Sequence, residues 1–470
     1  MAVAITTRKP FSFWASLREA LRGSHQDYTT GSLTRAIFLL AVPMVLETSM
    51  ESLFAIVDVF WVARLGAESI ATVGLVEALL TLIYAVGMGL GLSATAMVAR
   101  RVGEKDREGA AVAGVQAIAL GSIAGLTLGA PALFFAPRLL RLMGASPGVL
   151  AVGGAYARIA LGGGGVVVLL ILNNAVFRGA GDAAIAMRVL WLANSINLLL
   201  DPCLIFGLGP FPRLGVTGAA VATLTGRSIG VIYQLFRLAR GGEHIRILAR
   251  QLSLNVQVML RLLKVSLTGI AQMLAPHIAW ISLMRIVSLF GNSALAGYTI
   301  GIRVIVFFIL PSWGLSGAAA TLVGQSLGAG QPQRAEQSVW KTGSYNMWLM
   351  GGVGAFLILF PTPVTHLFTH DPAIVAFAAA CLRIVSIGNV GYAYEMVMMQ
   401  AFNGAGDTRA PTVVNFFGFI VFEIPLAYVL AVLMDMKVQG VYWAITIAES
   451  VIAVMLVLLF RRGSWKRQKI

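Results

Sequence analysis

The sequence predicts an all-α membrane protein in which twelve transmembrane helices form two pseudo-symmetric six-helix bundles. Three observations support this fold class. Of the 470 residues, 58% are hydrophobic and only 12% are charged, against roughly a quarter charged in ordinary soluble domains. Apolar runs long enough to cross a bilayer recur along the whole chain, separated by short polar connections. Parts of the first half also return in the second half at a constant spacing.

The apolar runs divide the chain into spans, a linker and two tails. The twelve predicted spans are 34–62, 69–99, 109–136, 149–177, 184–208, 213–237, 258–288, 294–323, 335–360, 373–400, 410–434 and 438–460. The expected organisation is an N-terminal tail (1–33), an N-terminal bundle (34–237), a linker (238–257), a C-terminal bundle (258–460) and a basic tail (461–470). The first apolar run is too long and too uninterrupted for a removable signal sequence. We expect the N-terminal tail to be flexible, with attachment to the membrane surface as the alternative.

The chain has a net charge of +15, and the distribution of its positive charges predicts its topology in the membrane. Most of the 35 lysines and arginines fall in connections on one side of the predicted spans. Positive charge in short connections marks the cytoplasmic side of a membrane protein. We therefore expect an integral, multi-pass protein of the plasma (inner) membrane with both termini in the cytoplasm, and no nucleic-acid partner.

Three sequence motifs repeat at a spacing of 225 residues. The motif "FRGAGD" (Phe177–Asp182) returns as "FNGAGD" (Phe402–Asp407). The same spacing relates "LGAESIA" at 65–71 to "FGNSALA" at 290–296, and "VGEKDREGA" at 102–110 to "LGAGQPQRA" at 327–335. Because one repeat holds six spans, both halves enter the membrane with the same orientation. This relation predicts a symmetry axis along the membrane normal and a substrate path between the halves.

Polar side chains inside the spans are the candidates for ion coupling. A charged group within a membrane span is costly and is therefore functional by default. Asp58 lies late in the first span and Asp201 late in the fifth, and Asn197 shares a helix face with Asp201 because it lies one turn earlier. At the spacing of 225 the second half carries only Leu283, Phe422 and Leu426. The fold does not need the three polar groups, which predict an ion-coupling site rather than a structural clasp.

The first span carries two further acids, and several residues are expected to distort helices. Glu47 and Glu51, one turn apart, are candidates for lining a cavity and attracting a cationic substrate, with simple contact to water as an equal alternative. Pro43 and Pro202 are expected to bend the first and fifth helices, because proline removes a backbone donor. The glycine run at 162–165 is expected to weaken the fourth helix.

These motifs, together with "VDVFWVARLGAESIATVGL" at the end of the first span, resemble those of the multidrug and toxic compound extrusion family over about residues 30 to 460. The resemblance implies two six-helix bundles around a V-shaped cavity and export of amphipathic, often cationic compounds in exchange for protons or sodium ions. The chain is similar to the branch with an acid in the first helix and Asn-xxx-Asp in the fifth. This branch implies Tyr156 and Asn174 as neighbours in the ion site, although residue counting places Asn174 toward the inner end of its helix and Asp58 toward the outer end.

The second half departs from the other main branch of that family, in which acids in the seventh and tenth helices form the ion site. Here the seventh span has His277 and no acid, whereas the tenth offers Glu395. Both residues are kept as substrate or cavity candidates. Glu423 and Glu449 are further acids within spans.

The remaining patterns predict a transporter and not an enzyme. The chain has no P-loop "GxxxxGK[ST]", so ATP bound by this chain is not expected to drive transport. Cys203 and Cys381 lie in apolar spans and predict neither a disulfide nor a metal site. We expect no cofactor, a proton as the coupling cation, and sodium held by Asp58, Asn197 and Asp201 as the alternative.

The expected partners are small amphipathic organic substrates and membrane lipid, and the expected assembly is a monomer. A flippase for lipids or lipid-linked oligosaccharides is the alternative from another class, because arginines also occur within the predicted spans. A flippase of this kind requires a basic cavity to hold a pyrophosphate.

Overall fold

The computed structural model describes residues 13–24, 26–241, 245–468 and 470, and this part of the chain is helical without any β-strand. The first half contains α1 (Phe13–Arg22), α2 (Leu33–Ala63), α3 (Ala67–Gly103), α4 (Arg107–Leu142), α5 (Pro147–Gly162), α6 (Gly164–Ala180), α7 (Ala183–Phe206), α8 (Val216–Arg240) and the 3-10 turn η1 (Ala249–Gln251). The second half contains α9 (Val256–Ser288), α10 (Asn292–Gly328), α11 (Pro332–Leu359), α12 (Pro361–His366), α13 (Pro372–Ile387), α14 (Asn389–Ala405), α15 (Arg409–Asn415), η2 (Phe416–Glu423), α16 (Ile424–Tyr428), η3 (Val429–Leu433), α17 (Lys437–Arg461) and η4 (Ser464–Arg467).

The helices confirm the predicted all-α membrane class. Within the described residues, nine helical stretches are long and apolar enough to cross a membrane when α5–α6 and α15–η3 each count as one. The bent pair α13–α14 makes a tenth. The helices α8 and α11 are also long, but they lie outside this set, and α11 begins with the polar run "PQRAEQSVWKTGSYN". The predicted number of twelve spans therefore stays a prediction.

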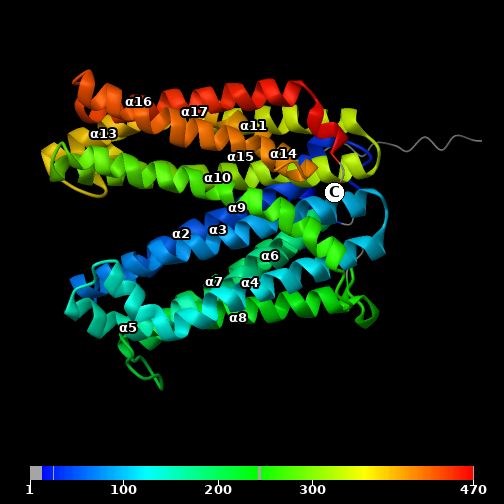
Figure 1. Cartoon of the computed structure of the whole chain (residues 1–470), viewed down its shortest axis with the longest axis horizontal. Helices are drawn as coiled ribbons and strands as arrows, with labels where there is room; N and C mark the ends of the chain where they lie inside the picture. Colours follow the sequence, from blue (N-terminus) through cyan, green and yellow to red (C-terminus); the bar gives the residue numbers. More distant parts are fainter. Residues whose placement is uncertain (1–12, 25, 242–244, 469) are drawn as a thin grey trace, which may run out of the picture.

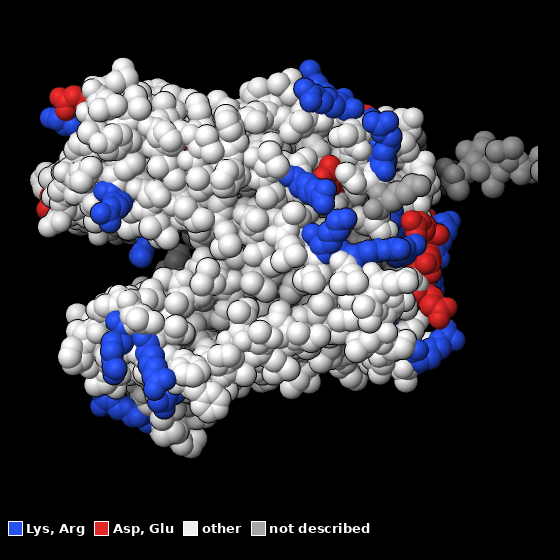
Figure 2. All heavy atoms as spheres, viewed as in Figure 1, with Lys and Arg blue, Asp and Glu red and all other residues white. Residues whose placement is uncertain are grey.

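The helices form two lobes that separate at one end of the molecule and join at the other (Figure 1). We call the joined end, where α1 and the C-terminus lie, the tail end, and the opposite end the open end. The space-filling view shows the hollow between the lobes at the open end (Figure 2). One hydrophobic core fills the first lobe, and two clusters fill the second. Val258 and Leu262, at the start of α9, pack on the core of the first lobe, so packing crosses the predicted bundle boundary.

The repeated motifs mark equivalent helix ends in the two halves. Gly66 precedes α3 with φ of 99°, and Gly291 precedes α10 with φ of 102°. Gly181 ends α6 with φ of 91°, and Gly406 ends α14 with φ of 84°. Only glycine adopts such positive φ values without steric cost. The repeats are therefore sequences that begin and end helices, which explains why they persist between halves.

Glycine also breaks one span in each half at equivalent positions. The fourth predicted span breaks at Gly163 into α5 and α6, as the glycine run predicted. Its counterpart breaks at Gly388, where α13 and α14 meet at 57°. By contrast, α2 and α7 run without interruption through Pro43 and Pro202. The prediction that these prolines bend their helices stays a prediction.

The two lobes meet through pairs of glycines that obey the same spacing of 225 residues. A methyl group at Gly89 of α3 would lie 2.6 Å from the backbone nitrogen of Ile270 in α9. At the equivalent place, a methyl group at Gly314 of α10 would lie 2.8 Å from the Cα atom of Val45 in α2. Small residues let membrane helices approach this closely. We call this contact surface between the lobes the seam.

A second glycine pair closes the seam at the tail end. A methyl group at Gly103 would lie 2.8 Å from the Cα atom of Gln325, and one at Gly328 would lie 3.1 Å from the carbonyl carbon of Arg100. These residues lie in the last turns of α3 and α10, which both end at the tail end. The backbones of α3 and α10 therefore touch in both directions where the lobes join.

The segment before α2 is ordered and bridges the two lobes, so the prediction of a flexible tail is wrong for residues 13–24 and 26–32, whereas residues 1–12 lie outside the described part. The Tyr28 hydroxyl donates to the Gly181 carbonyl of the first lobe (3.3 Å). Arg334 of the second lobe donates to the carbonyls of Tyr28 (2.8 Å), Thr30 (2.9 Å) and Gly31 (3.0 Å). Burial raises the pKa of the Tyr28 phenol, so it remains a donor at neutral pH. Sequence periodicity cannot reveal contacts of this kind, because the partners lie far apart along the chain.

The variant Gly103→Ala should destabilise the closed tail end. Its methyl group would crowd the backbone of α10, and such overpacking costs about 1–3 kcal/mol. We expect a lower midpoint of thermal unfolding for the purified protein. The control is Gly74→Ala on the same helix, where a methyl group meets nothing within 4 Å. Equal midpoints for the two variants would contradict a tight seam.

Candidate functional site

A cavity of about 260 Å³ lies between the lobes. Both halves line it, but with different chemistry. The first half contributes the charged side chains Glu47, Glu51, Arg178 and Arg227. The second half contributes mainly soft and aromatic side chains, which are Met273, Trp313, Met396 and Met399, besides the amides of Gln400 and Asn403. The charged lining therefore comes from the first half, whereas methionine and aromatic side chains from both halves, including Met44, Tyr84 and Met88 of the first, also line the cavity.

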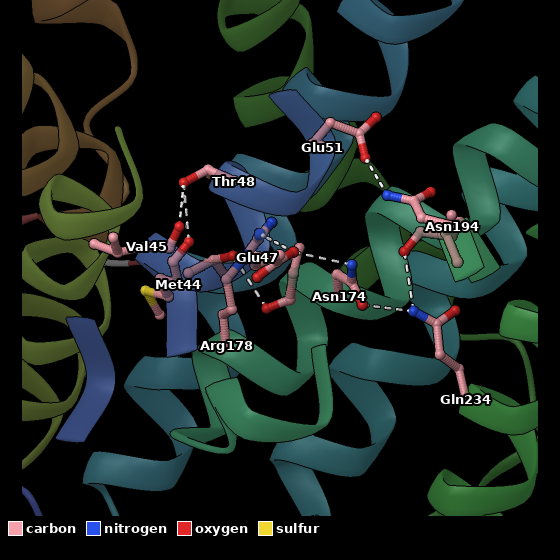
Figure 3. A network of polar contacts seen from close by, with 12 residues as sticks. Met44, Val45, Glu47, Thr48, Glu51, Asn174, Arg178, Asn194 and Gln234 are labelled. Atoms are coloured by element: carbon pink, nitrogen blue, oxygen red, sulfur yellow. Dashed lines mark hydrogen bonds and ion pairs between the residues drawn. The ribbon is translucent and has the colours of Figure 1, made fainter. Parts of the chain in front are cut away.

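Glu47 is the centre of a buried hydrogen-bond network (Figure 3). Its Oε1 atom accepts from Asn174 Nδ2 (3.0 Å) and from Arg178 Nη1 (3.0 Å). Asn174 and Arg178 lie one turn apart on α6, so both side chains point toward α2. Gln234 of α8 donates to Asn174 Oδ1 (2.7 Å) and accepts from Asn173 (3.1 Å). We call these five residues the Glu47 network.

A second ion pair lies beside this network. Glu51 is 3.9 Å from Arg227 and accepts from Asn194 at 3.4 Å. The Arg227 guanidinium also lies 5.7 Å from the centre of the Tyr84 ring, within the range of a cation–π contact. Each acid on the cavity wall thus faces an arginine, and the formal charges of the four groups cancel.

Asp58, Asn197 and Asp201 come together farther toward the open end. Asp201 is fully buried, and its carboxylate interacts electrostatically with that of Asp58. Asn197 Nδ2 donates to Thr223 Oγ1 at 2.9 Å and, with a longer contact of 3.4 Å, to Asp201 Oδ1. Tyr156 is buried within electrostatic range of Asp58. We call Asp58, Tyr156, Asn197, Asp201 and Thr223 the Asp58 cluster.

The Asp58 cluster has unused acceptors. Asp58 Oδ1, Asn197 Oδ1 and Asp201 Oδ2 are buried and make no hydrogen bond within the described chain. Oxygen atoms of carboxylates and amides are ligands for small hard cations, and two neighbouring carboxyls can share a proton. The arrangement is therefore suited to binding either a proton or a small cation.

The structure places Asn174 in the Glu47 network and away from the Asp58 cluster. Glu47 and Asp58 are eleven residues apart on α2, which corresponds to roughly 16 Å along a helix. Residue counting had pointed to this difference in depth. Of the five candidate ion-coupling residues, the structure thus brings together Asp58, Tyr156, Asn197 and Asp201.

The four substrate candidates lie in three different places. Glu47 and Glu51 line the cavity. His277 is exposed on α9, with its Nδ1 atom 2.8 Å from the Met273 carbonyl, and is not among the lining residues. Glu395 is buried inside the second lobe, where the carboxyls of Glu423 and Glu449 approach it.

Sequence reasoning missed Thr223, Arg178 and Gln234. Thr223 and Gln234 are neutral, so the search for charges within spans passed over them. Arg178 lies in the repeated motif "FRGAGD", one residue beyond the predicted span 149–177, so a search for charges within spans does not find it. At the spacing of 225 its counterpart is Asn403, so the comparison that identified Asp58 and Asp201 could also have identified Arg178.

Known proteins match both halves of the chain. A family model described as MatE matches residues 43–203 and 269–429. The probable multidrug resistance protein NorM of Thermotoga maritima is 25% identical, and the match covers 93% of this chain and 94% of the relative. A crystal structure of MATE in complex with MaL6 superposes with a TM-score of 0.88 at 28% identity, covering 94% of this chain and 99% of the other. An outward-facing conformation of a multidrug resistance MATE family transporter gives a TM-score of 0.87 at 28% identity, with 96% and 98% covered.

The variant Gln234→Leu should destabilise the first lobe and loosen Asn174. Gln234 is fully buried and makes hydrogen bonds with Asn173, Asn174 and the Leu170 carbonyl. Hydrogen bonds inside membrane proteins average about 0.6 kcal/mol each, so the loss of three predicts about 2 kcal/mol. Thermal unfolding of the purified protein measures this, with Gln257→Leu on the exposed start of α9 as the control. A midpoint equal to that of the control would argue against a stabilising network.

Proposed function

Because the chain belongs to the MatE family, we propose that it is a secondary active antiporter that exports amphipathic, often cationic compounds in exchange for protons. One observation carries this proposal. The same lobe holds a charged wall facing a central cavity and, farther toward the open end, a separate buried pair of carboxylates. Such a pair of sites is what exchange of a substrate for an ion requires.

The cavity wall fits substrates that share an apolar body and a positive charge but differ in shape. Methionine side chains are flexible and polarizable, so a surface lined with them accommodates different apolar bodies. Trp313 and Tyr84 add aromatic faces that attract cations. Glu47 and Glu51 supply negative charge for a cationic group. The name of the Thermotoga relative, a probable multidrug resistance protein, agrees with such a range of substrates.

The Asp58 cluster is the proposed site of the coupling ion. We favour a proton, because two buried carboxyls beside an amide can bind and release one without a rigid coordination shell. Sodium is the alternative, and its ligands would be Asp58, Asn197 and Asp201. Occupancy by the ion would alter α2, which carries both Asp58 and Glu47, and so lower the affinity of the cavity for substrate.

The open end is proposed to face the outside of the cell. The basic connections and both termini would then lie in the cytoplasm, as the positive-inside rule requires. The likeness to an outward-facing family member supports the same assignment. In the cycle that follows, the lobes close at the open end, the seam opens at the tail end, and the ion leaves inward.

A flippase function is less well supported. A pyrophosphate would need a basic cavity, whereas the charged lining of this cavity pairs two acids with two arginines. The exposed arginines on α5, α9 and α13, namely Arg158, Arg285 and Arg383, are not among the residues that line it.

The variant Asp201→Asn tests the proposed function directly. Proteoliposomes containing the protein and loaded with ethidium are exposed to an imposed pH gradient or an imposed sodium gradient. We expect wild-type export under the pH gradient and a fall to the level of protein-free liposomes for Asp201→Asn, because the variant cannot ionise. The control is Asp435→Asn, an exposed residue between η3 and α17 whose φ of 54° asparagine also tolerates.

The outcomes separate the alternatives. If only the sodium gradient drives export, the coupling ion is sodium and not a proton. Undiminished export by Asp201→Asn under every gradient would refute the Asp58 cluster as the coupling site.

A further inference from the structure

Building on the proposed export of cations, we infer that Arg178 is a built-in occupant of the substrate's cation site. In this structure its guanidinium holds the Glu47 carboxylate. An organic cation that enters the cavity takes the place of Arg178 on this carboxylate, and the released arginine loosens the closed tail end. Arg178 thus sets the affinity for cations and links their binding to opening of the seam.

The Glu47 carboxylate is built to receive one more donor. Glu47 is only 4% exposed, and its side chain lines the cavity. Its Oε1 atom accepts from Asn174 and Arg178, whereas its Oε2 atom is buried and has no hydrogen-bond partner in the described chain. A buried carboxylate oxygen without a partner is costly, so a ligand cation that pairs with it gains free energy.

Arg178 is held in a way that allows displacement. Among the residues that the structure describes, the Arg178 side chain makes one hydrogen bond, from Nη1 to Glu47, and the side chain is 29% exposed. A single contact of this kind is weaker than a two-pronged guanidinium–carboxylate pair. Asn174, fixed by Gln234, would keep the carboxylate in place after the guanidinium has left.

The backbone at Arg178 belongs to the seam. Thr321 of α10 donates to the Arg178 carbonyl at 3.0 Å, and Gln325 donates to the Gly179 carbonyl at 3.1 Å. Tyr28 donates to the Gly181 carbonyl. At the C-terminal end of α6 the Arg178 carbonyl also accepts from the Gly181 N–H (3.0 Å). The second lobe and the N-terminal segment add donors to the carbonyls of Arg178, Gly179 and Gly181. The ion pair with Glu47 fixes this turn from the cavity side.

The second half has no ion pair equivalent to that of Glu47 and Arg178. The residues at the spacing of 225 from Glu47 and Arg178 are Gln272 and Asn403, which are buried and neutral. The scaffold therefore forms without an ion pair at this position. Glu47 and Arg178 therefore act in the recognition of positively charged ligands and are not required for packing.

Binding of ethidium, an amphipathic organic cation, tests the displacement. For purified protein, the variant Arg178→Gln should bind ethidium about fivefold more tightly than wild type, the factor expected when a partly exposed ion pair no longer competes. Arg178→Lys, which keeps a competing cation, should remain close to wild type. The control Arg158→Gln removes an exposed arginine of the same lobe and should change nothing.

A double-mutant cycle identifies the carboxylate involved. Glu47→Gln should weaken ethidium binding, and adding Arg178→Gln to it should give no gain, because the competed group is gone. A gain that persists in the double variant would overturn the inference. Thermal unfolding of each variant verifies that it is folded.

Labelling at the tail end tests the link to the seam. Ser326 on α10 is 1% exposed, and Ser326→Cys, with Cys203 and Cys381 replaced by alanine, reports opening through its reaction with a membrane-impermeant maleimide. Ethidium should raise the labelling, and Arg178→Gln should raise it without ethidium. Unchanged ethidium affinity in Arg178→Gln, while the wild type still exports the dye, would refute this inference alone. Absence of ethidium export under any gradient would refute the proposed function instead.

Discussion

The close approach of glycines across the seam is the contact on which the rest of the structure depends. Gly89 meets α9 and Gly314 meets α2, while Gly103 and Gly328 bring the ends of α3 and α10 together. Inside a membrane, helices associate through packing and not through the hydrophobic effect, so contacts between small residues decide where the lobes join. Because the joined region lies toward the tail end, the cavity opens toward the other end, and Glu47 and Glu51 of α2 line that cavity.

A symmetric scaffold carries an asymmetric set of charges. The glycine pairs, helix caps and helix breaks obey the spacing of 225 residues, whereas the charged residues of the cavity and of the Asp58 cluster do not. The counterparts of Asp58 and Asp201 in the second half are Leu283 and Leu426. The counterparts of Glu47 and Arg178 are Gln272 and Asn403. Symmetric positions therefore provide the rigid lobes and their contact. The charged groups of the cavity wall and the Asp58 cluster are concentrated in one lobe, where α2 connects them.

The sequence predicted those features that depend on local pattern. The composition and the recurring long apolar runs predicted the all-helical class, and the glycine run predicted the weak point at Gly163, where the helix breaks. The grouping of Asp58 with Asp201 followed from their depth in neighbouring spans. The partner of Asn174 could not be predicted, because it depends on the rotation of α6 relative to α2 and α8. The bridging contacts of Tyr28 with both lobes depend on tertiary structure in the same way.

The hydrogen bonds at the C-terminal end of α6 are comparable in energy to what one coupling ion can supply. Three hydrogen bonds, donated by Thr321, Gln325 and Tyr28, join the last turn of α6 to the second lobe and the N-terminal segment. At about 0.6 kcal/mol each they hold this turn by about 2 kcal/mol. One elementary charge moving down a potential of about 100 mV supplies on the order of 2.3 kcal/mol. The hydrogen bonds of this turn are therefore weak enough for a single ion moving through the proposed exchange to release them.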